Sequence, residues 1–182
     1  MSKKHSLERP IAWIEKTINT FAPEYRKYGE FAYGSALLSP TKNAREQDIY
    51  HAMRDVQPGD FIIHLVDNEE FDGVSFAAEP YKTVSLEGKE FFAVPLRNFR
   101  RLSPPLNRSV LFGKPFGKQL KQMIIDGLKH TFFTHDLKLG QGRYLTPVFP
   151  SLMEVFDAAY QSVAGMSLSD LAAPKDDSVV NP

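Results

Sequence analysis

Asp72 and the later segment Glu87-Gly88-Lys89 carry acidic and basic side chains in the order Asp, then Glu-x-Lys, that is typical of metal-dependent nucleases. That chemistry needs two carboxylates to bind a divalent cation beside a lysine. Gly88 lies between the charged residues of the second segment and indicates a hairpin turn. We therefore interpret this segment as a turn and not as a nuclease site.

Other catalytic and metal-binding patterns are missing from the sequence. The chain has no cysteine, which excludes disulfides, thiolate zinc sites and cysteine nucleophiles. Its five histidines lack the spacing with carboxylates that a metal site needs, and His64, within an apolar run, is typical of a core histidine. Gly113-Lys114 lacks the glycine spacing of a phosphate-binding loop, and no serine lies in a nucleophile elbow. The sequence predicts a protein without enzymatic activity, metal or cofactor.

Charge is unevenly distributed although the formal net charge is zero. From Glu46 to Glu90 there are eleven acidic and three basic residues, whereas from Arg97 to Lys129 there are eight basic residues and one acidic residue. A basic segment of this density can bind a phosphate backbone, although a solvated basic surface has the same composition. The residues that we predict to contact phosphates are Arg97, Arg100, Arg101 and Lys114.

Apolar spacing and turn residues outline the elements that must position these side chains. Apolar residues at helical spacing predict helices over residues 10–21, 44–56, 115–129 and 152–163. Short apolar or aromatic runs between turn residues predict strands over residues 31–38, 61–66, 73–78, 82–86 and 90–95. Ser103-Pro104-Pro105 is expected to break the chain. Trp13 lies off the apolar stripe of the first helix and is expected to pack on the edge of the sheet.

This order of elements indicates an α+β fold with a small, partly closed, mostly antiparallel β-barrel and flanking helices. We divide the 182 residues into an N-terminal helical extension (1–30), one domain (31–165) and a flexible tail or linker (166–182). No segment is long and apolar enough to cross a membrane, and no secretion signal is present. The protein is expected in the cytoplasm.

The centre of the chain resembles the PUA-like superfamily, in particular its EVE and YTH branches. The residues that carry this resemblance are Val56-Gln57-Pro58-Gly59-Asp60-Phe61-Ile62-Ile63-His64-Leu65 and then Phe71-Asp72-Gly73-Val74-Ser75. The later run Gln141-Gly142-Arg143-Tyr144-Leu145-Thr146-Pro147 resembles the end of EVE-like domains at the N-termini of McrB-type, modification-dependent restriction NTPases. The helix expected around Trp13 departs from the minimal family pattern. Gly59 permits a sharp turn and Asp60 can bond neighbouring amides, so the Gly-Asp turn is interpreted as structural.

The resemblance implies a non-catalytic reader domain over residues 31–165 that binds nucleic acid, in particular double-stranded DNA with a modified base. Such a base would be extruded from the duplex into an aromatic-lined pocket. Carried over by position, the pocket residues are Tyr33, Ser35, Leu38, Ser39, Ser75 and Phe76. The resemblance also implies a motor NTPase and a nuclease in other domains or subunits, with the C-terminal tail as a linker towards them.

Two alternatives stay open at this point. The chain can be an RNA-binding module of the PUA or YTH type, or a protein-interaction domain that docks through its amphipathic first helix. Tyr33 and Phe76 can equally be core aromatics, because a single aromatic on a strand usually packs in the core. Salt-dependent binding to nucleic acid separates the nucleic-acid reading from the protein-interaction reading.

Overall fold

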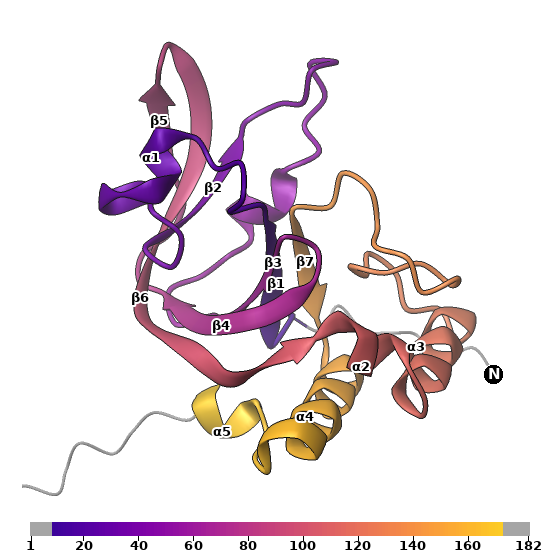
Figure 1. The fold of residues 1–182 in the computed structure, drawn as a ribbon. Helices are drawn as coiled ribbons and strands as arrows, with labels where there is room; N and C mark the ends of the chain where they lie inside the picture. The colour runs from indigo at the N-terminus through magenta and orange to yellow at the C-terminus, as the bar shows by residue number, and fades with distance from the viewer. Residues whose placement is uncertain (1–8, 173–182) are drawn as a thin grey trace, which may run out of the picture.

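A seven-stranded curled sheet runs through the computed structural model, which describes residues 9–172 (Figure 1). Its strands are β1 (Ala12–Thr17), β2 (Ala36–Pro40), β3 (Phe61–Val66), β4 (Glu70–Ala77), β5 (Lys82–Leu86), β6 (Lys89–Asn107) and β7 (Leu145–Val148). They lie in the order β2-β6-β4-β3-β1-β7, and β5 also pairs with β6. The pair β1–β3 is parallel and the other strand pairs are antiparallel.

Strand β6 joins the two parts of the sheet. Its first part pairs with β2 and β5 and its later part pairs with β4, so one curved strand of 19 residues belongs to both parts (Figure 1). Register shifts between β4 and β6 mark the bends. The result is a half-barrel with flanking helices, and it confirms the predicted α+β class.

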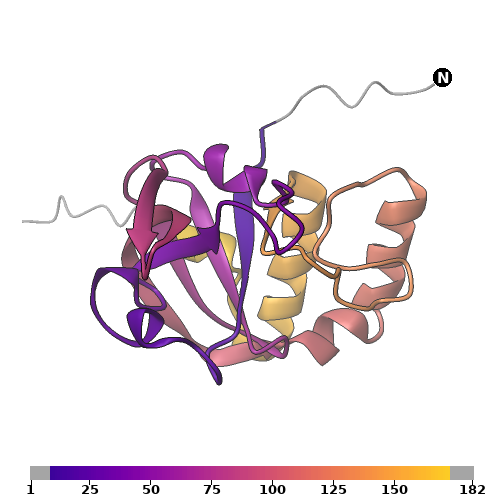
Figure 2. The same ribbon diagram turned by 90° about the horizontal axis from the view of Figure 1, so that it is seen from above.

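The helices are mostly short. They are α1 (Glu24–Lys27), α2 (Arg108–Phe112), α3 (Phe116–Ile125), α4 (Pro150–Ala164) and α5 (Ser169–Ala172), with the 3₁₀ turns η1 (Gly29–Phe31) and η2 (His51–Arg54). Figure 2 shows α4 beside the curled sheet and α2 and α3 next to it. Phe71 of β4 packs edge-on against Phe156 of α4, with ring centroids 5.0 Å apart, and this contact joins the sheet to the helical layer.

Successive residues of β1 and β3 enter two different cores, as the alternation of strand side chains requires. Ile14 and Ile63 belong to the larger core, which α2, α3 and α4 cover. Trp13 and Ile62 belong to a smaller core on the other face, closed by Met53 of η2. Both faces of β1 are therefore buried.

The helix predicted over residues 10–21 is wrong, because residues 12–17 form β1. This strand lies between β3 and β7 inside the sheet, so the segment belongs to the barrel and is not a helical extension. The helical spacing of Ile11, Ile14 and Ile18 is misleading, since Ile11 and Ile18 are 49% and 43% exposed. Pairing with two neighbouring strands outweighs a local helical pattern.

Three further predictions need correction. Of the helix predicted over residues 44–56, only the 3₁₀ turn η2 forms. Ser103-Pro104-Pro105 lies inside β6, where the register shift opposite Phe71–Gly73 leaves the prolines without ladder partners in β4. The tail does not start at residue 166, because Leu168 is fully buried and residues 169–172 form α5. Residues 173–182 of the predicted tail lie outside the described residues.

Candidate ligand-binding site

The six residues predicted to line a base pocket are spread over two strands and the turn before β2. Ser75 is fully buried, and its Oγ lies 2.7 Å from His64 Nε2. Leu38 and Ser39 are buried in β2, whereas Ser35 is exposed. Phe76 is half-buried, with its ring centroid 5.4 Å from that of Phe61.

Tyr33, the remaining aromatic of that set, is also half-buried and makes its polar contact inside the protein. Its hydroxyl donates a hydrogen bond to the Asp72 carboxylate, and its ring packs edge-on against His64 and Phe99. Burial and the neighbouring Asp72 carboxylate raise the pKa of Tyr33 far above its ordinary value. The assignment of these six residues to a ligand stays a prediction.

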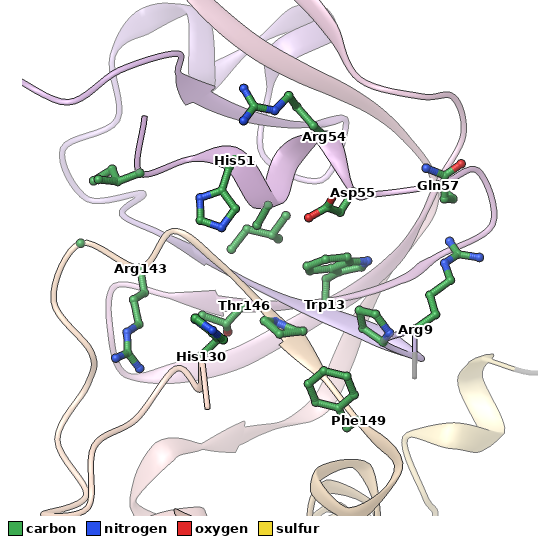
Figure 3. Close-up of a pocket in the computed structure, with 16 residues that line it drawn as sticks. Arg9, Trp13, His51, Arg54, Asp55, Gln57, His130, Arg143, Thr146 and Phe149 are labelled. Atoms are coloured by element: carbon green, nitrogen blue, oxygen red, sulfur yellow. The ribbon is translucent and has the colours of Figure 1, made fainter. Parts of the chain in front are cut away.

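A cavity of about 730 Å³ lies elsewhere, between the N-terminal end of β1, η2, β7 and the loop that precedes β7 (Figure 3). None of the six predicted pocket residues lines it. Its volume is in the range of pockets that hold small organic ligands. The cavity is assembled from segments that lie far apart in the sequence, from Arg9 to Phe149.

Apolar side chains form one wall of the cavity, with Trp13 near the middle of it (Figure 3). Trp13 is 3% exposed, so only a small part of its indole borders the free space. Leu145, Pro147 and Phe149 of β7 and its extension continue this wall. The prediction that Trp13 packs on the edge of the sheet is wrong, because β1 is an interior strand.

Asp60 fixes the orientation of Trp13. The indole Nε1–H donates to Asp60 Oδ2 at 2.9 Å, and the same oxygen accepts from the Gln57 backbone N–H at 2.8 Å. Asp60 Oδ1 accepts from Arg9 at 2.5 Å. The Gly-Asp turn therefore bonds a neighbouring amide as predicted, and it also holds two residues of the cavity wall.

Three arginines and a histidine form the rim of the cavity. Arg9 reaches it from the segment before β1, His51 and Arg54 reach it from η2, and Arg143 reaches it from the loop before β7 (Figure 3). One carboxylate, Asp55, accompanies these three arginines in the lining. The cavity therefore has a positive rim beside an apolar wall.

Each of the three arginines also contacts another group of the protein. Arg54 pairs with Asp48 at 2.6 Å and lies over the Phe92 ring at 5.6 Å. Arg143 donates to the Thr131 carbonyl, and Arg9 pairs with Asp60. Because Arg9 and Arg54 keep 58% and 42% of their side chains exposed, their guanidinium groups can still reach a ligand.

A buried polar cluster anchors β7 behind the cavity. Glu15 of β1 is fully buried and contacts His64 Nδ1 at 2.5 Å, Arg26 at 3.2 Å and the Tyr144 hydroxyl at 2.5 Å. The Tyr144 hydroxyl also accepts from the Leu38 backbone N–H at 2.9 Å. Tyr144 thereby links the cluster to β2 and immediately precedes the cavity residue Leu145.

The pKa of Glu15 reflects this cluster. Burial alone would raise the pKa of the carboxyl group, but the hydrogen bond with His64, the charges of His64 and Arg26 and the Tyr144 hydroxyl outweigh burial. Together they hold the pKa of Glu15 below its ordinary value of 4.5. Glu15 is therefore a charged group inside the protein, neutralised by Arg26.

The residues predicted to contact phosphates do not line the cavity. Arg97, Arg100 and Arg101 lie on β6, where Arg101 pairs with Asp72 at 3.2 Å but keeps 70% of its side chain exposed. Lys114 is exposed between α2 and α3. Their contact with phosphates stays a prediction.

Sequence reasoning missed most of the cavity. Arg9, His51, Arg54 and His130 lie in segments without a recognisable motif, and only folding brings them together. The run Gln141–Pro147 was the available signal, because Gly142, Arg143, Leu145, Thr146 and Pro147 all line the cavity.

Within residues 9–172, no group of three or more histidine, aspartate or glutamate side chains could hold a metal ion. In the same part of the chain, no helix has the length and apolar character needed to span a bilayer.

Solved structures with a similar fold include two that we describe here. One is the N-terminal domain of Staphylothermus marinus McrB, with a TM-score of 0.49 and 14% identity, over 81% of this chain and 93% of that chain. The other is protein Atu2648 from Agrobacterium tumefaciens, with a TM-score of 0.42 and 12% identity, over 86% of this chain and 97% of that chain. No protein-family model matches the chain, and no curated protein matches it.

Proposed function

We propose that this protein is a non-catalytic nucleic-acid-binding module whose cavity receives one base of a bound strand. The observation that carries the proposal is the positive rim of Arg9, Arg54 and Arg143 beside the apolar wall around Trp13. A nucleotide has the matching chemistry, because it joins a planar apolar ring to a phosphate. The base lies against the wall, and the arginines bind the phosphates beside it.

Arginine suits the outer part of this site. Its planar guanidinium binds phosphate oxygens through two parallel hydrogen bonds and stays charged at any relevant pH. The bonds from Arg9, Arg54 and Arg143 to protein acceptors orient the three side chains before a ligand arrives. A prearranged rim loses less side-chain freedom on binding.

Base extrusion is the way in which a duplex can use such a site. Taking a base out of its stack costs a few kcal/mol. Contact with aromatic and apolar side chains can offset this cost, since stacking on an aromatic side chain contributes about 1–3 kcal/mol per base. A cavity of about 730 Å³ has room for one base and its sugar.

The specific nucleic acid that we propose as the ligand is double-stranded DNA with a modified base. This step is supported by the family resemblance of residues 56–65, 71–75 and 141–147. In that role the protein is the targeting module of a modification-dependent restriction system, and the motor NTPase and nuclease are separate domains or subunits. RNA is the alternative ligand for the same cavity.

The test is a double substitution, Arg54→Ala with Arg143→Ala. Binding is measured over a salt series on duplexes that contain N6-methyladenine, 5-methylcytosine, 5-hydroxymethylcytosine or no modification, and on RNA of the same sequence. We expect weaker binding to every duplex by a similar factor, and a log-affinity against log-salt line flattened by about one unit per lost phosphate contact.

Lys82→Ala is the matched control, because Lys82 is an exposed cation on β5 and does not line the cavity. It should leave affinity and salt slope close to those of the unchanged protein. Binding by the double variant with the original slope would overturn the assignment of the cavity rim. A protein that binds none of these nucleic acids would overturn the proposed function itself.

A further inference from the structure

Asp55 is the one carboxylate among the described residues that line the cavity, and it is exposed. It directly follows η2, and in the view of Figure 3 its carboxylate lies between that turn and the Trp13 indole. In the described part of the chain this carboxylate has no hydrogen-bond or ion-pair partner. By contrast, the carboxylates of Asp48 and Asp60 are both paired with arginines. The carboxylate of Asp55 is therefore available to a ligand.

The other polar side chains of the lining select less strictly than a carboxylate does. The arginines bind phosphates, which are the same at every nucleotide. Gln57 can both donate and accept a hydrogen bond, and so can a neutral imidazole of His51 or His130. An ionised carboxylate only accepts hydrogen bonds, and it repels phosphate. The part of a nucleotide that suits Asp55 is therefore a base edge that carries an N–H group.

A base in the cavity changes the surroundings of Asp55. An exposed carboxylate is solvated by water, and a base that fills the cavity displaces part of this water. A base with an amino group replaces the lost hydrogen bonds, whereas a carbonyl oxygen at the same place leaves the carboxylate unpaired. Adenine and cytosine carry an exocyclic amino group, and thymine and uracil carry a carbonyl oxygen instead.

We infer that Asp55 is a specificity-determining residue that accepts a hydrogen bond from the exocyclic amino group of the base in the cavity. This inference rests on the proposed function and names the class of base that the cavity selects, which is adenine or cytosine with at least one amino hydrogen. An amino group with one added methyl group keeps an N–H and is accepted. An amino group with two added methyl groups has none and is rejected.

Two pairs of bases isolate this contact. N6-methyladenine has one amino hydrogen, and N6,N6-dimethyladenine has none. 5-Methylcytosine and thymine carry the same ring methyl group, but the first has an amino group where the second has a carbonyl. Each base is placed opposite an abasic site in one duplex sequence, so that no base pair has to be broken, and also in single-stranded RNA of that sequence. Equilibrium affinities are measured at one salt concentration.

The substitution Asp55→Asn keeps the size of the side chain and replaces one acceptor by a donor. It should lower the affinity ratio within each pair by about tenfold, the contribution of one hydrogen bond to a charged group. Affinity for thymine should rise, because the asparagine can donate to its carbonyl. Glu79→Gln is the matched control, since it removes the same charge from an exposed residue between β4 and β5 that does not line the cavity. It should leave both ratios unchanged.

Two further readouts separate this role from a structural one. Thermal unfolding of Asp55→Asn should occur at the temperature of the unchanged protein, because the carboxylate has no partner in the described part of the chain. Trp13 is the only tryptophan of the chain and borders the same cavity, so its fluorescence reports entry of the base. At equal concentration the response should be larger for the amino-bearing member of each pair.

The outcomes are distinct. Unchanged ratios in Asp55→Asn overturn the role of Asp55 and leave the nucleic-acid module intact, and so does an unchanged protein that binds both members of each pair equally. Altered ratios with a lowered unfolding temperature also overturn it, because Asp55 would then act through the fold. If the unchanged protein binds none of these duplexes or RNAs, the proposed function fails, and the role of Asp55 fails with it.

Discussion

Single residues set the interior electrostatics of this protein, and Glu15 is the clearest case. A carboxylate at 0% exposure is stable only when charged and hydrogen-bonding partners surround it. Arg26, His64 and Tyr144 are those partners, and they come from α1, β3 and the residue before β7. The polar cluster therefore fixes where three separate segments meet.

The substitution Glu15→Gln should lower the free energy of unfolding by about 3–5 kcal/mol, because it leaves the buried Arg26 charge without its counter-charge. The measurement is urea unfolding at about pH 7, under the conditions used for the unchanged protein. Glu24→Gln is the matched control, since Glu24 is 79% exposed and pairs with Lys27 only at the surface. A Glu15→Gln protein as stable as the control would show that Arg26 does not depend on this carboxylate.

Acid should weaken the same cluster. The folded pKa of Glu15 lies below its ordinary value of 4.5, so the ionised carboxylate stabilises the fold above about pH 4.5. This stabilisation is lost as the pH falls through the folded pKa. The unfolding free energy of the unchanged protein should thus fall more steeply below about pH 4.5 than that of Glu15→Gln. Parallel curves would show that Glu15 is not the titrating group.

Strands were predictable from the sequence where one local pattern decided them. The run Phe61–Val66 is apolar, rich in β-branched residues and preceded by a Gly-Asp turn, and it forms β3 with the predicted bounds. β1 was missed because both of its faces are buried, so its apolar residues do not alternate with polar ones. The cavity was missed for a related reason, since its arginines and histidines lie in turns and loops whose positions depend on the whole sheet.

At the level of elements, Phe99 fills the bend between β6 and its neighbours. A Cβ atom added at Gly73 would lie 2.5 Å from Phe99 Cε2, and one at Gly34 would lie 2.9 Å from the same ring. Both glycines therefore let the ring pack against the backbone. The Phe99 ring thus occupies the space that side chains at these two positions would need.

The substitution Gly73→Ala should destabilise the fold by about 1–3 kcal/mol, the usual cost of overpacking a close contact. In a Phe99→Ala background the same change should cost much less, because the ring that it meets is gone. Unfolding of the two single variants and the double variant gives this coupling as a double-mutant cycle. Additive effects would mean that Gly73 is needed for another reason, such as its approach to the Arg100 carbonyl at 3.3 Å.

At the scale of the whole molecule, the acidic segment Glu46–Glu90 contains β3, β4 and β5, and the basic segment Arg97–Lys129 begins within β6 and ends after α3. The two segments touch where Arg101 pairs with Asp72. Pairs at the surface contribute little to stability, so this contact leaves Arg101 available to a ligand. Under the proposed function, the uneven charge therefore bears on where a nucleic acid would lie more than on how the protein folds.

The substitution pair Arg100→Ala and Arg101→Ala tests how far a duplex extends from the cavity. In the order of the sheet, β6 is separated from β7 by β4, β3 and β1, a span of about 19 Å along the strands' hydrogen bonds. A duplex carries a phosphate charge about every 1.7 Å of its axis, so one duplex can reach both the cavity rim and β6.

Removing both arginines should then weaken modified and unmodified duplexes by a similar factor and flatten the salt slope by about one unit for each lost contact. The ratio between the duplexes should stay constant, because neither arginine lines the cavity. If the slope keeps its original value while the Arg54→Ala and Arg143→Ala protein loses slope, the cavity rim alone holds the backbone, and the duplex runs away from β6.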